Sequence, residues 1–254
     1  MRLQGKTALV TGATSNIGRA IAVAYAAEGA HVVVSGRSKE RGEQVVEDIR
    51  AAGGRADFVQ ADLDGSARVS HALAEEAGRL LGGRIDILVN NAGIFPGDST
   101  AATDEETFDR VYAVNVKAPY FLTGAVAPEM AARGDGVIIN LGSWVARLGL
   151  GIGTLYASTK GAVETLTRAW SAEYGPAGVR VNAISPGVIR TPDLDPAVPH
   201  PGDVMMRGTP AGGSGAPEAI AHAAVYLASD ESAFVHGTVI DVDGGRIGAA
   251  VIAA

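Results

Sequence analysis

A tyrosine and a lysine four residues apart, Tyr156 and Lys160, are the side chains of this 254-residue chain whose types and spacing suggest acid–base chemistry. They stand at the start of a helical pattern, where residues i and i+4 share a face, so the ammonium is expected beside the phenol. A phenol titrates near pH ~10, and a neighbouring cation favours phenolate and lowers that pKa. The pair predicts a proton donor or acceptor, although the spacing alone is common on helix surfaces.

A serine lies thirteen residues before the tyrosine, at the end of an expected strand. Ser143 follows the apolar run that begins at Val137, and open α/β sheets bind ligands at the carboxyl ends of their parallel strands. No histidine partner for this serine is evident, which weakens a hydrolase interpretation. The five histidines show no metal-ligand spacing, so we expect no metal site.

A glycine-bearing turn connects the first expected strand to the first expected helix. Residues Thr11–Gly18 read TGATSNIG. Such a turn lets the backbone approach a pyrophosphate, whose charge is met by free N–H groups at the helix start. Glycine turns after strands are common, so the turn gains weight only from its place in an alternating chain.

Short β-branched runs alternate with longer helical patterns along the whole chain. This alternation predicts a single α/β domain of the Rossmann type over residues 1–254, with a doubly wound, mainly parallel seven-stranded sheet and helices on both faces. The expected strands are Thr7–Val10, Val32–Val34, Phe58–Val59, Ile85–Val89, Val137–Asn140, Val179–Ile184 and Thr238–Val242. The expected helices are Ile17–Glu28, Glu40–Ala52, Ala67–Leu80, Glu105–Ala132, Tyr156–Tyr174 and Pro217–Ala228.

Bulk composition excludes several classes of protein. The net charge of -7 is spread along the chain and leaves no basic surface for nucleic acid. Without cysteine there is neither a disulfide nor a thiolate metal site, which suits a reducing compartment. No apolar run approaches the ~20 residues of a membrane helix, and the first residues lack a signal-peptide core. We therefore expect a cytoplasmic protein without nucleic-acid or membrane partners.

Taken together, the motifs resemble the short-chain dehydrogenase/reductase family over essentially the whole chain, and the 3-oxoacyl-(acyl-carrier-protein) reductase branch within it. The family's TGxxxGxG motif is matched except at the middle glycine, where Asn16 stands. Asparagine is the non-glycine residue that best tolerates positive φ, so we expect the turn to survive. The matching residues are Thr11, Gly12, Gly18, Asn90–Gly93, Asn115, Ser143, Tyr156, Lys160, Pro186, Gly187 and Val242–Gly245.

The resemblance implies an NAD(P)(H)-dependent oxidoreductase that interconverts a carbonyl and a secondary alcohol by hydride transfer. It assigns the proton to Tyr156 and a stabilising hydrogen bond on the same oxygen to Ser143. It implies that Lys160 lowers the tyrosine pKa and binds the nicotinamide ribose, and that Asn115 holds a water in a proton relay. Pro119 lacks an N–H and predicts an interruption of the helix that carries Asn115.

The resemblance also implies the cofactor-binding residues, which follow several strands. NADP(H) is favoured, because the second strand ends without an acid before Glu40 and Arg37 can bind a 2′-phosphate as a fork. NAD(H) stays open, since a loop arginine is often only solvated. The implied residues are Gly12, Ser15, Asn16, Ile17, Gly18, Arg37, Asp62, Leu63, Asn90, Ala92, Gly93, Tyr156, Lys160, Pro186, Gly187, Val188, Ile189 and Thr191.

Residues of three loops are expected to face the substrate, and most are apolar, which favours a largely apolar ketone or a 3-oxoacyl-type substrate. Residues 186–215, rich in Pro and Gly, are expected to form a lid. Arg147 and Arg190 are candidate anchors for an anionic group. The expected substrate residues are Ser143, Trp144, Val145, Leu150, Tyr156 and Met205, with Ile94, Phe95, Pro96, Leu148, Ile152, Val188, Ile189, Leu194 and Met206 around them.

Partners follow from the same resemblance. A homotetramer or homodimer is implied, built on the helices Glu105–Ala132 and Tyr156–Tyr174. An acyl carrier protein stays open but is not favoured, because it needs basic surface and Arg133 is the one candidate found. The apolar residues 249–254 either pack against a subunit or close the site. The alternative function is a catalytically silent NAD(P)-binding scaffold or sensor, although silent relatives usually lose the tyrosine or the lysine.

Overall fold

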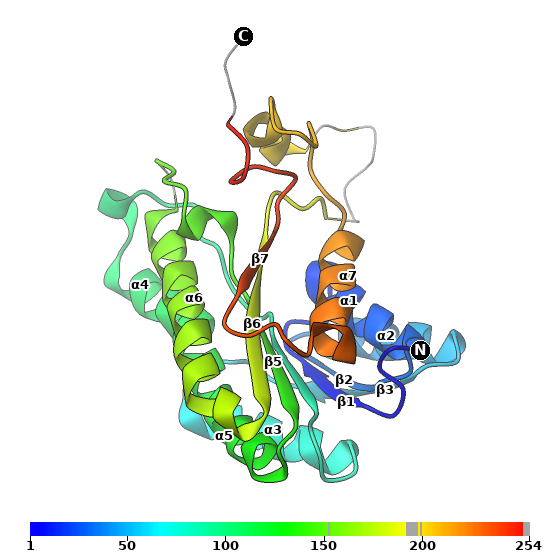
Figure 1. Cartoon of the computed structure of the whole chain (residues 1–254). Coiled ribbons are helices and arrows are strands. Elements are labelled where there is room, and N and C mark those ends of the chain that lie inside the picture. The colour runs from blue at the N-terminus through cyan, green and yellow to red at the C-terminus, as the bar shows by residue number, and fades with distance from the viewer. Residues whose placement is uncertain (152, 192–197, 199, 251–254) are drawn as a thin grey trace.

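Nearly continuous apolar runs form the middle of a parallel sheet (Figure 1). The computed structural model describes residues 1–151, 153–191, 198 and 200–250. In this part of the chain the strand order is β3-β2-β1-β4-β5-β6-β7, and every neighbouring pair is parallel. The predicted doubly wound Rossmann-type fold is confirmed. The strands are β1 (Thr7–Val10), β2 (His31–Gly36), β3 (Arg55–Gln60), β4 (Ile87–Asn90), β5 (Gly136–Leu141), β6 (Val179–Pro186) and β7 (Val239–Val242).

Two layers of helices bury the two faces of the sheet (Figure 1). Side chains alternate along a strand, so Ala8 and Val10 of β1 pack under one layer and Leu9 under the other. One layer holds α1 (Asn16–Ala27), α2 (Lys39–Ala51) and α7 (Pro217–Ala228). The other holds α3 (Ala67–Leu80), α5 (Ala118–Arg133) and α6 (Thr154–Tyr174).

The long helix expected over Glu105–Ala132 is interrupted, as Pro119 predicts. It consists of α4 (Glu105–Tyr112), a π-helical turn η2 (Ala113–Lys117) and α5. In a regular α-helix the N–H of residue 119 would donate to the carbonyl of Asn115, and proline has no such N–H. The helix therefore changes from i→i−4 to i→i−5 hydrogen bonding at the turn that carries Asn115.

Strand ends differ from the prediction where polar residues alternate with apolar ones. β3 is longer than the expected Phe58–Val59, because it is an edge strand paired only with β2 and need not be apolar throughout. β4 begins at Ile87 rather than Ile85. The preceding Asp86 is buried: its backbone still bonds to Thr7 and Val137 of the neighbouring segments, and its carboxylate serves a polar network.

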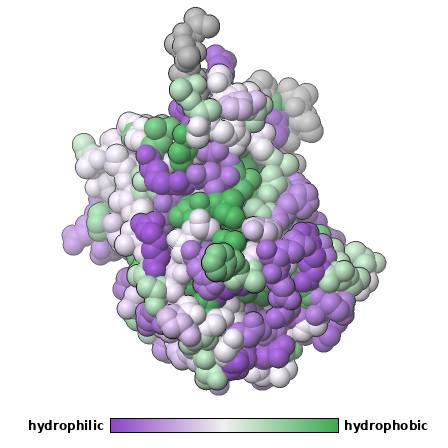
Figure 2. Space-filling model, viewed as in Figure 1, coloured by the Kyte–Doolittle hydropathy of each residue, from purple (hydrophilic) through white to green (hydrophobic). Residues whose placement is uncertain are grey.

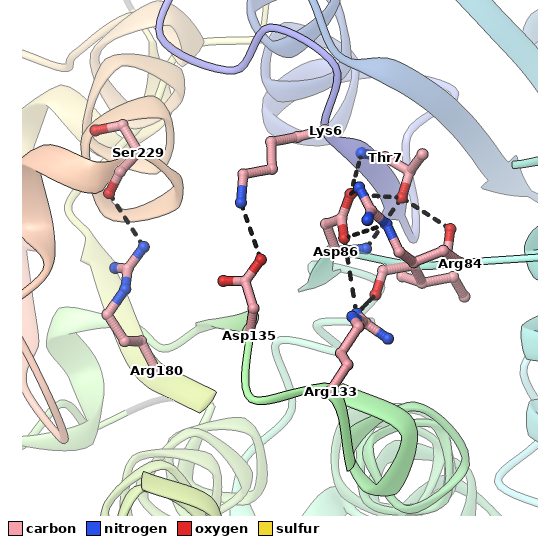
Figure 3. A network of polar contacts seen from close by, with 9 residues as sticks. Lys6, Thr7, Arg84, Asp86, Arg133, Asp135, Arg180 and Ser229 are labelled. Carbon is pink, nitrogen blue, oxygen red and sulfur yellow. Dashed lines mark hydrogen bonds and ion pairs between the residues drawn. The ribbon is translucent and has the colours of Figure 1, made fainter. Parts of the chain in front are cut away.

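That network ties the amino ends of the strands together (Figure 3). The carboxylate of Asp86 accepts hydrogen bonds from the backbone N–H of Thr7 at 2.9 Å and from its hydroxyl at 3.0 Å. It also pairs with Arg84 at 2.8 Å and lies 3.7 Å from Arg133. A buried charge is tolerated when it is paired and hydrogen-bonded in this way. The charges around Asp86 at this edge of the sheet are thereby paired within the protein.

Beyond β6 the chain crosses the carboxyl edge of the sheet. Ile189 forms a bridge with Gly215, and Pro201–Met206 is a short 3-10 helix. Residues 192–197 of the expected lid, with Leu194, and the end of the expected apolar tail, 251–254, lie outside the described residues, as does Ile152. Within the described ranges, no helix combines the length and the apolar character needed to span a bilayer.

Candidate active site

A cleft of about 1250 Å³ opens at the carboxyl edge of the sheet. Strand order reverses between β1 and β4, so the loops that follow these two strands diverge to opposite faces and leave a crevice. Loops after β1, β2, β3, β4, β5 and β6 all contribute to its walls. Residues far apart in sequence are thus brought to one place, as expected of a dinucleotide site in an open α/β sheet.

The glycine turn after β1 packs directly on the loop after β4. A Cβ atom on Gly18 would lie 2.3 Å from the carbonyl oxygen of Gly12, and one on Gly12 would lie 2.8 Å from Cα of Ala92. The side-chain amide of Asn91 donates to the carbonyls of Thr11 at 2.8 Å and of Gly12 at 3.1 Å. Glycine is required here for close approach of protein backbone, and Asn91 fixes the spacing.

Asn16 takes the left-handed conformation that the turn needs. Its φ is 46°, and it is the sole non-glycine residue with positive φ among those described. The prediction that asparagine preserves the turn is confirmed. α1 starts at this residue with no acid in its first turn and no side-chain cap from Ser15. The N–H groups of a helix start have no intrahelical partner, so this turn suits a pyrophosphate.

Two arginines stand where β2 gives way to α2. Arg37 and Arg41 are exposed and line the cleft, opposite Asp62 and Leu63 of the loop after β3. Neither arginine forms an ion pair with a carboxylate in the described part of the chain. Sequence reasoning found Arg37 and missed Arg41, which lies four positions later in the first turns of α2. The two guanidinium groups together give this end of the cleft a positive charge that suits a phosphate.

The tyrosine, the lysine and the serine meet in the same cleft. α6 carries Tyr156 and Lys160, and β5 leads into Ser143, which is buried. The hydroxyl of Ser143 lies close enough to the phenol of Tyr156 to lower the pKa of that phenol. Nζ of Lys160 donates to the carbonyl of Leu141 at 2.7 Å and lies 5.4 Å from the centroid of the Tyr156 ring. The expected juxtaposition is therefore present.

The ionisation of this group differs from the sequence-based expectation. Burial raises the pKa of Tyr156 to about 12, and the hydrogen bond from Ser143 opposes this only in part. Burial also lowers the pKa of Lys160 to about 8. Spacing predicted a tyrosine pKa lowered by the lysine, and this was wrong, because desolvation disfavours both charged forms. Tyr156 keeps its proton at neutral pH and is poised as an acid.

Asn115 lies behind the cleft rather than in its wall. Its side-chain oxygen accepts from the N–H of Ile94 at 2.9 Å, and its amide donates to the carbonyl of Ile94 at 3.0 Å and to Thr159 at 3.1 Å. Thr159 in turn donates to the carbonyl of Tyr156 at 2.7 Å. The side chain of Asn115 therefore joins the loop after β4 to the turn of α6 that carries Tyr156.

The part of the cleft around Tyr156, where a substrate is expected, has several apolar side chains. Phe95, exposed for 59% of its surface, meets the Tyr156 ring edge-on with centroids 4.8 Å apart. Trp144 is buried in a cluster with Val188 and Met206. The expected residues Trp144, Val145, Leu150 and Met205 all line the cleft.

The two candidate anchors for an anionic group are engaged elsewhere. Arg147 forms ion pairs with Glu164 and Asp241, so the expectation for it was wrong. Arg190 donates to the carbonyl of Val198.

Three predicted catalytic or cofactor residues are absent from the cleft wall: Asn90, Asn115 and Thr191. Asn90 points into the sheet and donates to Asn140 at 2.9 Å and to Thr123 at 3.2 Å. Of the residues expected around the substrate, Pro96, Leu148 and Met206 are absent from the wall too, and the other described ones line it. The wall also contains Asn91, which was predicted only as part of the Asn90–Gly93 motif.

The wall residues that sequence reasoning did not single out are Thr14, Ser35, Gly36, Arg41, Ala61, Asp64, Asp109, Arg110, Tyr112, Ala113, Val114, Lys117, Leu141, Gly142 and Gly153.

Comparison with known proteins places this geometry in context. A protein-family model described as enoyl-(acyl carrier protein) reductase matches residues 12–246. Two similar proteins come from Thermotoga maritima. One is an uncharacterised oxidoreductase, 38% identical, covering 96% of this chain and 98% of its own. The other is a 3-oxoacyl-[acyl-carrier-protein] reductase, 36% identical, covering 97% of this chain and 100% of its own.

Solved structures agree with these matches. A short chain dehydrogenase/reductase family protein superposes with a TM-score of 0.87 at 45% identity, covering 98% of this chain and all of its own. A blue fluorescent protein from a metagenomic library, in complex with NADPH, superposes with a TM-score of 0.90 at 33% identity, covering 98% of this chain and 100% of its own.

The buried lysine yields a stability prediction. The pKa of Lys160 falls from 10.5 to about 8 on folding, so charging it costs the folded state stability below pH 8. At 1.36 kcal/mol per pH unit this cost is about 3 kcal/mol, partly offset by the bond to Leu141. We expect Lys160→Met to raise the free energy of unfolding by about 1–3 kcal/mol at pH 7, measured by urea denaturation. The gain should fade between pH 8 and 10.5, and a destabilised variant at pH 7 would contradict the argument.

Proposed function

The chain belongs to the short-chain dehydrogenase/reductase family, and from that membership we propose that it interconverts a carbonyl and a secondary alcohol with NAD(P)(H). The meeting of Tyr156, Ser143 and Lys160 in the wall of a cleft shaped for a dinucleotide carries this proposal. Relatives identified as oxidoreductases support the reaction class.

The residues divide the work as follows. A bound nicotinamide supplies or accepts the hydride. Tyr156, protonated at neutral pH, donates its proton to the substrate oxygen, and in the reverse direction it takes the proton back. Ser143 donates a hydrogen bond to the same oxygen and stabilises the charge that develops there. Lys160, with its depressed pKa, binds the nicotinamide ribose and places a cation near the phenol.

The cofactor we favour is NADP(H). Arg37 and Arg41 offer two guanidinium groups at the end of β2, and the nearest acid along the chain from Arg37, Glu40, is not part of the cleft wall. Guanidinium groups bind phosphate oxygens through charge-assisted forks. A similar structure, at 33% identity, holds NADPH. Gly12, Asn16 and the start of α1 would hold the pyrophosphate.

The substrate we favour is a ketone on a largely apolar body, because the walls around Tyr156 are formed by Phe95, Trp144 and Met205. We propose that residues 186–215 act as its lid. A similar protein is a 3-oxoacyl-[acyl-carrier-protein] reductase, so a 3-oxoacyl substrate is the second candidate. Arg133, the candidate for carrier contact, donates to the carbonyl of Ile85 at the opposite edge of the sheet and does not serve the cleft (Figure 3).

The assembly we propose is a homo-oligomer, and its location the cytoplasm, in keeping with a chain that has no cysteine. An apolar groove runs between α5 and α6, lined by Tyr120, Phe121, Gly161, Ala162 and Leu166 among others. Figure 2 shows hydrophobic side chains gathered along β7, whose outer edge pairs with no strand of the described chain. A monomeric mass in solution would count against this assembly.

Tyrosine substitution tests the reaction. We expect Tyr156→Phe to lower kcat about 10²–10⁴-fold, because the proton donor is lost, and to leave NADPH affinity within about threefold. Turnover is measured by NADPH oxidation against an acetoacetyl thioester, aryl and cyclic ketones, quinones and steroids. Tyr174→Phe, at the far end of the same helix, is the matched control. Binding of NADPH without turnover of any carbonyl would favour the alternative, a silent scaffold or sensor.

Charge reversal tests the cofactor. We expect Arg37→Asp and Arg41→Ala each to weaken NADPH binding about 10–100-fold, the range for one lost charge-assisted hydrogen bond. NADH affinity should stay the same or improve, since NADH has no 2′-phosphate. Dissociation constants come from fluorescence titration, with Arg50→Ala at the other end of α2 as control. Equal losses for both nucleotides would reject the assignment.

A further inference from the structure

A carboxylate is buried two helical turns beyond the catalytic tyrosine. Glu164 follows Lys160 by four residues on α6, and 4% of its side chain is exposed. One of its oxygens, Oε1, has no hydrogen-bond partner among the described residues. Burial raises the pKa of Glu164, an effect that Arg147 and then Arg168 oppose and Asp241 supports. A buried acid this close to the site, with half its hydrogen-bonding capacity unused, calls for a physical reason.

Arg147 is the cation that compensates it. Its Nε lies 3.3 Å from Oε2 of Glu164, and its Nη1 donates to Oδ2 of Asp241 at 3.1 Å, while Nη2 contacts the other oxygen of Asp241. A planar guanidinium can serve two carboxylates in different directions, which a lysine cannot do with the same geometry. Arg147 thereby joins α6 to the last strand, β7.

The segment held by this ion pair is the one that carries Ser143. A Cβ atom on Gly142 would lie 3.1 Å from Oε1 of Glu164, so the carboxylate touches the backbone where the segment leaves β5. Arg147 binds the same carboxylate where the segment ends. Between them, Ala146 donates to the carbonyl of Ser143 at 3.0 Å. One side chain of the catalytic helix thus contacts both ends of a six-residue segment.

We propose that Arg147, through its pair with the buried Glu164, is a positioning residue that holds the hydroxyl of Ser143 against Tyr156. The proposal rests on the proposed function for its catalytic consequence. Without the guanidinium, the link from the end of the segment to Glu164 and Asp241 is lost, and the buried carboxylate is left without its nearest cation. The backbone of the segment then shifts, and Ser143 loses its fixed distance to the phenol. Misplacement of such a group lowers the rate of the chemical step more than substrate binding.

Kinetics give the first test. We expect Arg147→Met to lower kcat about 10–100-fold on the best substrate of the panel, with the KM for NADPH within about threefold. The double variant Ser143→Ala/Arg147→Met should be no slower than Ser143→Ala alone, because Arg147 acts only through that serine. Arg147→Lys should recover part of the loss. Multiplying effects in the double variant, or an unchanged kcat in Arg147→Met, would overturn the proposal.

Tryptophan fluorescence gives a second test that needs no substrate. The chain has two tryptophans, and Trp144 lies buried inside the held segment. In a Trp170→Phe background, we expect Arg147→Met to raise the acrylamide quenching constant of Trp144 at least twofold. Arg79→Met, which breaks an exposed pair with Glu76 on α3, is the control and should change nothing. Unchanged quenching in Arg147→Met would show that the segment is held without the pair.

A neutral pair separates positioning from folding. Arg147→Met/Glu164→Gln removes the buried charge as well as its partner, so this variant should be more stable in urea denaturation than Arg147→Met. We expect it to retain the quenching increase and the loss of kcat. Recovery of both would mean that charge balance alone matters and would overturn the role of Arg147. If the wild type turns over no carbonyl, the proposed function fails, and the quenching experiment still decides whether Arg147 holds the segment.

Discussion

The close approach of two loops at the reversal of strand order is the constraint on which the rest of this site depends. Gly12 and Gly18 have no room for a Cβ, because the backbone of the turn and of the loop after β4 already occupies it. Asn91 bonds the two loops together from one side. Both loops also position further parts of the cleft. α1 starts directly after the glycine turn, and Asn115 is hydrogen-bonded to Ile94 in the loop after β4.

The amino and carboxyl edges of the sheet differ in how their charged side chains are paired. At the amino edge, charges are paired within the protein, as around Asp86. At the carboxyl edge, Arg147 is paired with two carboxylates, whereas Arg37 and Arg41 lack carboxylate partners in the described chain and Lys160 is buried with a depressed pKa. The burial of Lys160 costs stability, and the two exposed arginines are hydrated. These three cations are the groups to which a phosphate or a ribose can bind.

Much of the fold could be predicted, because parallel strands that are buried on both faces appear in the sequence as apolar runs. Pro119 likewise predicted the interruption of the helix that carries Asn115. The edge strand β3 was underestimated, since one polar face hides a strand from such a pattern. In the site, motif spacing located Tyr156, Lys160 and Ser143. It could not give the direction of the tyrosine pKa, which depends on burial. It also chose Asn90 where Asn91 lines the cleft, because which of two neighbours faces inward depends on where the strand ends. Glu164 gave no signal, since its partner Arg147 is seventeen positions away and on a loop.

The conformation of Asn16 has a consequence for how this sequence can change. Asparagine codons differ from glycine codons at more than one base, so the glycine that a left-handed residue would otherwise favour is reached only through an intermediate. One intermediate is aspartate, which puts a negative charge at the start of α1 against the expected pyrophosphate. The other is serine, which tolerates this backbone region less well. Both two-step routes from asparagine to glycine therefore pass through a residue that suits either the charge or the backbone of this turn less well.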